Sequence, residues 1–237
     1  MRTALLVPGS ASSGDFVQRA FSPLLSSDDA VVTIGAGGGD AAVLTAGLAS
    51  EYRRAVQRGD RVTAVIGVSV GAHAAAEWAA AGSGLEERPP VLVLALPAWT
   101  GPPDETAELT AGAVAAIRQH GVPEELARLR RQFGDDWVVD ELVAAWAAKP
   151  EAELLAALTA TARSEAPTTD RLRMITAPTV VVALDADPFH PATVARTWAE
   201  TIPGAVLAKV GRDEPAADRS VFGRRVLQAL AEGTGAV

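Results

Sequence analysis

The chain has 237 residues, of which 49% are hydrophobic and 21% are charged. These fractions are typical of soluble globular proteins and exclude disordered, collagen-like and disulfide-scaffold classes. Lys and Arg together number 21 against 29 for Asp and Glu, and the resulting net charge of −8 disfavours binding to nucleic acid or to an anionic membrane. The length predicts one domain with a sizeable insertion.

Cysteine is absent and histidine occurs only three times, which limits the available chemistry. Disulfides and thiolate ligands are excluded, and a metal centre built from histidines would need nearly all three. The sequence therefore predicts no metal and no other cofactor. A chain without cysteine fits the reducing cytoplasm, and the apolar N-terminal stretch is too short for a signal peptide. No segment approaches the roughly 20 apolar residues of a membrane span.

Six short apolar runs rich in β-branched residues predict strands. They lie at residues 3–7, 30–34, 62–66, 91–96, 179–184 and 205–210. Because the runs are nearly continuous and do not alternate with polar residues, they are typical of strands covered on both faces. Helical patterns separate most of these runs, at residues 41–58, 72–81, 192–201 and 220–232. The alternation predicts an α/β fold with a doubly wound, mostly parallel six-stranded sheet.

Residues 101–174 interrupt this alternation with about four helical stretches separated by Gly and Pro. We therefore expect a core formed by residues 1–100 and 175–237, with residues 101–174 as a helical cap. Ligands of open α/β sheets bind beyond the carboxyl ends of the strands, which is where this insertion begins.

Three tryptophans belong to this predicted pocket. Trp99 ends the strand that leads into the insertion, and we expect it to line the pocket, with a place in the core as the alternative. Trp137 and Trp146 are expected to share one helix face that turns toward the site.

The clearest motif is Gly-x-Ser-x-Gly at residues 67–71, between a predicted strand and a predicted helix. Gly67 and Gly71 permit a tight turn that pushes Ser69 out above the sheet. In this motif the chain resembles the α/β-hydrolase superfamily, and the likeness extends over nearly the whole chain, since the insertion matches that family's cap position. The resemblance implies that Ser69 is a nucleophile.

The resemblance also implies an oxyanion hole. One donor would be the backbone N–H of Val70. The other would come from the loop after the first strand, which keeps the family's glycine at Gly9 but lacks its common histidine. We assign the N–H of Ser10 as the second donor, and the alternative is that this loop is merely a tight turn.

The family's triad acid follows the strand after the cap, where the chain offers Asp185 and Asp187. We prefer Asp187 because it directly precedes Pro188, as the acid usually does in the family. The alternative is that Asp187 only initiates a turn.

The family's histidine, which follows the last strand, is missing, since no histidine occurs after residue 190. His190 lies just past the acid and is our candidate base, with a loop or helix-capping role as the alternative. His73 is expected to be structural, and His120 is expected to cap the end of a helix.

These features predict a serine-dependent hydrolase that cleaves a small, largely apolar ester, thioester or lactone through an acyl-enzyme. The alternative is a non-hydrolytic protein of the same fold, such as a cyclase, an eliminase or another biosynthetic lyase, or a binding protein. The missing histidine favours this alternative, because a serine without a base is a weak nucleophile. The expected partner is a small-molecule substrate, and a homodimer is one option for the oligomeric state.

A second glycine-rich stretch, at residues 35–39, imitates the turn of a dinucleotide-binding site. Its third required glycine is replaced by Asp40, so we do not expect a nucleotide cofactor there.

Overall fold

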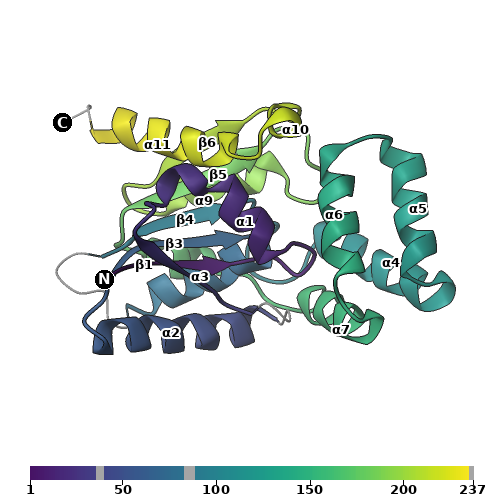
Figure 1. The fold of residues 1–237 in the computed structure, drawn as a ribbon, viewed down its shortest axis with the longest axis horizontal. Coiled ribbons are helices and arrows are strands. Elements are labelled where there is room, and N and C mark those ends of the chain that lie inside the picture. Colours follow the sequence, from purple (N-terminus) through teal and green to yellow (C-terminus); the bar gives the residue numbers. More distant parts are fainter. Residues whose placement is uncertain (36–39, 83–88, 235–237) are drawn as a thin grey trace.

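The computed structural model describes residues 1–35, 40–82 and 89–234 and contains one six-stranded sheet. Its strands are β1 (Arg2–Val7), β2 (Asp29–Thr33), β3 (Arg61–Val68), β4 (Val91–Ala95), β5 (Thr179–Leu184) and β6 (Val206–Val210). Their order is β2-β1-β3-β4-β5-β6, and every neighbouring pair is parallel (Figure 1). The predicted sheet is therefore confirmed.

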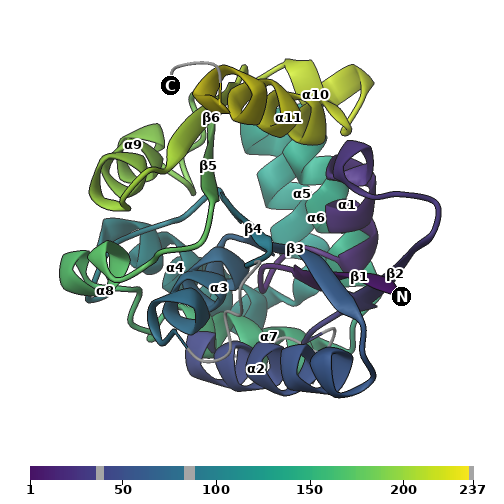
Figure 2. The ribbon, with the colours of Figure 1, turned by 90° about the vertical axis from the view of Figure 1, so that its left-hand side faces the viewer.

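Helices cover both faces of the sheet (Figure 2). One face packs against α2 (Ala41–Gln57), α3 (Val70–Ala80), α8 (Thr169–Arg173) and α9 (Ala192–Thr201), and the other packs against α1 (Gly14–Ala20) and α11 (Val221–Thr234). Successive strand residues point to opposite faces, so Leu5 joins one hydrophobic cluster and Leu6 joins the other. Because both clusters are buried, the strands carry the continuous apolar runs seen in the sequence. The short helices η1 (Ser22–Leu24) and α10 (Glu214–Ala217) complete the described elements of the core.

Four helices lie beyond the carboxyl ends of the strands (Figure 1). They are α4 (Glu105–His120), α5 (Val122–Phe133), α6 (Trp137–Ala147) and α7 (Glu151–Thr161), which we call the four-helix segment. Gly121 and Gly134 end α4 and α5 with φ angles of 83° and 65°, a conformation that glycine adopts without strain. The segment has its own hydrophobic cluster, with Leu129 and Trp146 among its buried members.

The two ends of the four-helix segment are joined by backbone hydrogen bonds. The N–H of Gly101 donates to the carbonyl of Pro167 at 3.1 Å, and the N–H of Ala166 donates to the carbonyl of Gly101 at 2.8 Å. The chain therefore leaves the core and returns to it at one place.

On α6, Trp137 and Trp146 lie on different faces. Trp146 joins the cluster inside the four-helix segment, whereas Trp137 packs against Phe16 and Phe222 of the sheet cluster. The expectation of a shared face is wrong for Trp137, because nine residues correspond to about 2.5 helical turns and place the two side chains on opposite sides.

Residues 36–39 of the dinucleotide-like stretch lie outside the described residues. Asp40 is the N-cap of α2, where its carboxylate accepts a hydrogen bond from the N–H of Val43 at 2.8 Å. In the described part of the chain, no helix has the length and apolar character needed to cross a membrane.

Candidate active site

Ser69 lies on the tight turn between β3 and α3, as the motif predicts. Its φ and ψ angles are 56° and −125°, an uncommon conformation for a residue with a side chain. A Cβ atom at Gly67 would lie 2.3 Å from the carbonyl oxygen of Gly71, and one at Gly71 would lie 2.0 Å from that of Val7. Both positions therefore require glycine, and the strained turn holds Ser69 at the carboxyl end of β3.

Two backbone N–H groups lie near Ser69 without acceptors. Val70 begins α3, so its N–H has no partner within the helix. The N–H of Ser10 likewise donates to no other described residue. The loop of Ser10 passes directly beside the serine, since a Cβ at Gly9 would lie 3.0 Å from the Cβ of Ser69. The two N–H groups can donate hydrogen bonds to an anionic oxygen that forms above Ser69.

The position of Ser69 and Ser10 also agrees with the order of the strands in the sheet. The loops of Ser10 and Ser69 follow β1 and β3, which are neighbours in the sheet, whereas β2 lies on the other side of β1. Ligands of open α/β sheets bind at such a switch point. Lys149 of the four-helix segment donates to the carbonyl of Ser10 at 3.3 Å and so links this loop to the segment.

Asp187 and His190 meet in the loop that follows β5. Nδ1 of His190 lies 2.8 Å from Oδ2 of Asp187, whose Oδ1 accepts from the N–H of Phe189 at 2.9 Å. The side chain of Asp187 is 3% exposed and that of His190 is 20% exposed. Asp185, the other candidate acid, is exposed and does not line the pocket described below.

Arg212 occupies the loop after β6, where the resemblance places a histidine. Its Nη1 lies 3.9 Å from Oδ1 of Asp187, and its Nε donates at 3.1 Å to Asp136, the N-cap of α6. Sequence reasoning missed this residue, although its position after the last strand was an available signal.

The carboxyl group of Asp187 has a lowered pKa. Burial alone would raise the pKa, but the charge and hydrogen bond of His190, the Phe189 N–H and the charge of Arg212 together hold it below the ordinary 3.8. Asp187 is therefore a carboxylate at neutral pH, and it can orient the imidazole of His190 and stabilise its charged form.

His73 is buried in the core and packs against two tryptophans. Its ring centroid lies 4.9 Å from that of Trp99 and 5.6 Å from that of Trp198, and its Nε2 accepts from the N–H of Ala98 at 3.1 Å. Burial, and then the charge of His190, lowers the pKa of His73 to about 3. A neutral, buried imidazole agrees with the structural role expected for His73. His120 is the exposed last residue of α4, as expected for a residue at a helix end.

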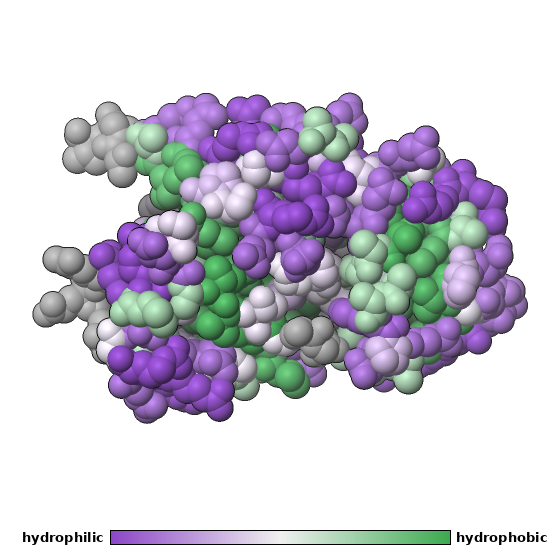
Figure 3. All heavy atoms as spheres, in the orientation of Figure 1, coloured by the Kyte–Doolittle hydropathy of each residue, from purple (hydrophilic) through white to green (hydrophobic). Residues whose placement is uncertain are grey.

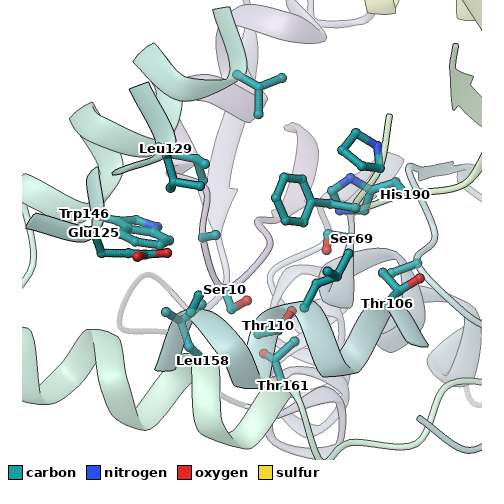
Figure 4. A pocket seen from close by; sticks show the side chains of 18 of the residues that line it. Ser10, Ser69, Thr106, Thr110, Glu125, Leu129, Trp146, Leu158, Thr161 and His190 are labelled. Carbon is teal, nitrogen blue, oxygen red and sulfur yellow. The ribbon is translucent and has the colours of Figure 1, made fainter. Parts of the chain in front are cut away.

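A cavity of about 350 Å³ lies between the four-helix segment and the carboxyl end of the sheet. Ser69, His190, Ser10 and Trp99 line it, so Trp99, which is 2% exposed, contributes both to the core and to the pocket wall. Figure 4 shows Ser69 and His190 near each other at one end of this pocket. Most of the other lining residues come from α4 to α7, and the apolar ones among these are Leu109, Ala113, Leu129, Phe133, Val138, Leu142, Trp146 and Leu158. Such a pocket suits a small, largely apolar ligand.

Within the part of the chain that the structure describes, no group of three or more His, Asp or Glu residues could hold a metal ion.

No known protein family and no curated protein matches the sequence. Solved structures do match, and one is MenH from S. aureus, with a TM-score of 0.72 and 16% identity over 98% of this chain and 94% of that one. The enol-lactonase from Burkholderia xenovorans LB400 gives a TM-score of 0.70 and 17% identity, covering 97% and 91% of the two chains. A thermophilic esterase from Thermogutta terrifontis gives a TM-score of 0.69 and 17% identity, covering 98% of this chain and 90% of that one. The chain has the α/β-hydrolase fold of these proteins, and a fold alone does not specify the reaction.

Proposed function

We propose that this protein is a serine hydrolase that cleaves a small, largely apolar ester, thioester or lactone through an acyl-enzyme on Ser69. The observation that carries the proposal is the 2.8 Å contact between His190 and Asp187 in a pocket that Ser69 also lines. The similarity to an esterase and to an enol-lactonase supports acyl chemistry on this fold.

In the acylation step, Oγ of Ser69 attacks the substrate carbonyl while its proton passes to Nε2 of His190. Asp187 accepts the Nδ1–H of His190, which keeps Nε2 free to take the proton and stabilises the imidazolium that forms. The carbonyl oxygen becomes an oxyanion and accepts hydrogen bonds from the N–H groups of Val70 and Ser10. When the tetrahedral intermediate collapses, the bond to the leaving alcohol or thiol breaks and His190 gives that group its proton.

Deacylation repeats these steps with water as the nucleophile. His190 removes a proton from the water, the hydroxide attacks the acyl carbonyl, and the bond between Oγ of Ser69 and the acyl group breaks. Ser69 regains its proton from His190, and the carboxylic acid product leaves. With a lactone, the leaving hydroxyl stays attached to the acyl chain, so one hydroxy acid is released.

In this proposal the acid and the base come from a single loop, three residues apart. Arg212 takes the place of the family's late histidine and helps to keep Asp187 ionised. The four-helix segment acts as the cap that encloses the substrate, whereas α8 at the end of the expected insertion packs on the sheet.

One observation favours the non-hydrolytic alternative. The hydroxyl of Ser69 makes no hydrogen bond to His190 or to any other described residue. Catalytic hydrogen bonds are often long in unliganded sites and tighten when substrate binds. A direct test of serine activation therefore separates the two functions.

That test is labelling with a fluorophosphonate probe, together with a screen of nitrophenyl esters of short-chain acids. We expect one label per chain on Ser69, no labelling of the Ser69→Ala variant, and slow labelling of His190→Ala. If the wild-type protein takes up no probe and hydrolyses no ester, the hydrolase proposal is wrong.

A further inference from the structure

The pocket has a polar end that the proposed acyl chemistry does not use. Glu125 of α5 and Trp146 of α6 line the same cavity as Ser69. Figure 4 shows these two residues on the opposite side of the pocket from Ser69 and His190. Figure 1 agrees, because α5 is the helix of the four-helix segment that lies farthest from the sheet. A substrate that fills the cavity would reach from Ser69 to this remote end.

Glu125 is a buried carboxylate at this end, with only 2% of its surface exposed. Arg128 donates two hydrogen bonds of 2.7 Å, one to each carboxylate oxygen, and so balances the charge. A carboxylate offers about four acceptor positions, so the pairing with Arg128 leaves about half of them free. Figure 4 shows the carboxylate of Glu125 directed toward the inside of the pocket.

Three buried polar groups of the same pocket lack partners among the described residues. They are Nε1 of Trp99, Nε1 of Trp146 and Oγ1 of Thr161, and Figure 4 shows Trp146, but not Thr161, beside Glu125. Buried donors are nearly always paired in folded proteins, so an unpaired donor in a pocket wall points to a partner on the ligand. The lining residues also include the polar Arg128 and Gln132 of α5 and the apolar Leu129 and Leu158, which belong to the same hydrophobic cluster as Trp146.

We propose that this end of the pocket binds a hydroxyl group carried by the acyl chain at a distance from its ester. The hydroxyl donates to Glu125 and accepts from Nε1 of Trp146, since a hydroxyl is both donor and acceptor. A carboxylate there would have to compete with Glu125 for Arg128, an ammonium would leave Trp146 unpaired, and a plain alkyl end would pair with neither Glu125 nor Trp146. The assignment of the ester to the Ser69 end rests on the proposed function.

The test compares nitrophenyl esters of straight-chain acids with esters of the same acids carrying a terminal hydroxyl, over a series of chain lengths. At the chain length that spans the pocket, we expect the wild-type protein to favour the hydroxylated ester by about 10-fold or more in kcat/KM. Trp146→Phe and Glu125→Leu should each move this ratio toward one.

Two threonines of α7 supply controls. Oγ1 of Thr159 and Oγ1 of Thr161 are also buried without partners among the described residues, and Figure 4 shows Thr161 away from Glu125 and Trp146. Thr159→Val and Thr161→Val should keep the wild-type ratio, whereas Trp146→Phe should lower it. The proposal is overturned if the wild-type protein shows no preference at any chain length, or if the threonine variants lower the ratio as much as Trp146→Phe does.

A binding measurement separates this proposal from the hydrolase function. Calorimetry on the Ser69→Ala variant would compare an alkanamide with the hydroxyalkanamide of the same length, so no turnover is needed. A hydroxyl-dependent gain in affinity that is lost in Trp146→Phe supports the subsite even if no ester is cleaved. Cleavage of esters without any hydroxyl-dependent gain in rate or affinity overturns the subsite and leaves the hydrolase function standing.

Discussion

At the level of single residues, the proposed function depends on His190 as the base that activates Ser69. Loss of a general base typically lowers turnover by about 10² to 10⁴-fold. We therefore expect His190→Ala to reduce kcat/KM for a nitrophenyl ester by that amount, measured at neutral pH. His120→Ala, which changes an exposed histidine at the end of α4, is the control and should leave kcat/KM unchanged. Wild-type turnover in His190→Ala would rule out His190 as the base.

His73 should make the stability of the protein depend on pH. Its pKa is about 3 in the folded protein against an ordinary 6.5, so the unfolded chain binds a proton that the folded chain does not. The free energy of unfolding should therefore fall by about 1.4 kcal/mol per pH unit as the pH drops below 6.5. The lowered pKa of Asp187 acts in a separate range, since the stability that it contributes is lost only as the pH falls below 3.8.

Denaturant unfolding between pH 7.5 and pH 4.5 would measure this slope. His73→Gln can still accept from the N–H of Ala98 but does not titrate, so its slope should be smaller by the contribution of one histidine. Equal slopes in the wild-type and variant proteins would show that His73 does not act in this way.

At the level of elements, the turn between β3 and α3 depends on two glycines. Gly71→Ala would place a Cβ atom 2.0 Å from the carbonyl oxygen of Val7, so we expect loss of Ser69 labelling and a lower melting temperature. Gly112→Ala, in the middle of α4 with no atom within 4 Å of the added Cβ, should instead stabilise the protein, by about 0.5 to 1 kcal/mol. Thermal unfolding and probe labelling of both variants would check this. Equal melting temperatures and equal labelling of Ser69 in the two variants would contradict the role given to Gly71.

Arg212 connects the loop after β6 with Asp187 and with the start of α6. Its removal in Arg212→Gln should lower kcat/KM by about 10 to 10²-fold, because small displacements of catalytic groups have effects of that size. It should also raise the pKa of Asp187, so activity should be lost at a higher pH on acidification.

Asp136→Asn tests which contact of Arg212 matters. This substitution weakens the link to α6 but leaves the guanidinium charge near Asp187. We expect kcat/KM to fall in Asp136→Asn without the change in acid sensitivity. If the pH profiles of the two variants coincide, Arg212 acts only through α6.

The sequence predicts the sheet well because its strands are buried on both faces. The run at residues 179–184 coincides with β5, and the other strands differ from their predicted bounds by at most two residues. Short helices carry too little periodicity to be assigned from sequence, so the sequence does not predict α1. For the same reason it does not show that α8 packs on the core through Leu172.

The site is predictable only where it depends on local sequence. The glycines around Ser69 and the short spacing between Asp187 and His190 are visible in the chain. Glu125, however, stands beside Glu124 in what reads as a solvent-facing first turn of a helix, yet Glu124 is 56% exposed at its side chain and Glu125 only 1%. The packing of α5 against its neighbours decides this difference, and the chain alone does not reveal it.

At the level of the whole molecule, the hydrogen-bonded ends of the four-helix segment allow a deletion. Replacing residues 102–165 with a short glycine linker should leave a folded sheet, since the bonds between Gly101 and residues 166–167 already close the gap. Stability should fall, because Trp137 would no longer cover Phe16 and Phe222.

The deleted form should also lose its selectivity for acyl chain length, since most of the pocket wall is gone. Circular dichroism would check the fold, and kcat/KM across a series of ester chain lengths would check the selectivity. An unchanged chain-length profile would show that the segment does not act as a cap.

The same junction has a consequence for how new specificities could arise. Ser69, Asp187 and His190 all belong to the sheet and its loops, whereas Glu125 and Trp146 both belong to the inserted helices. Figure 3 shows hydrophobic residues gathered on the inserted helices, with hydrophilic residues around them. Grafting a different helical insert at Gly101 and Ala166 would exchange the groups proposed to recognise the substrate and keep Ser69, Asp187 and His190, if the new insert replaces the contacts that Asp136 and Lys149 make with Arg212 and Ser10. Recombination between relatives at this single junction would thus give proteins with one reaction and many substrates.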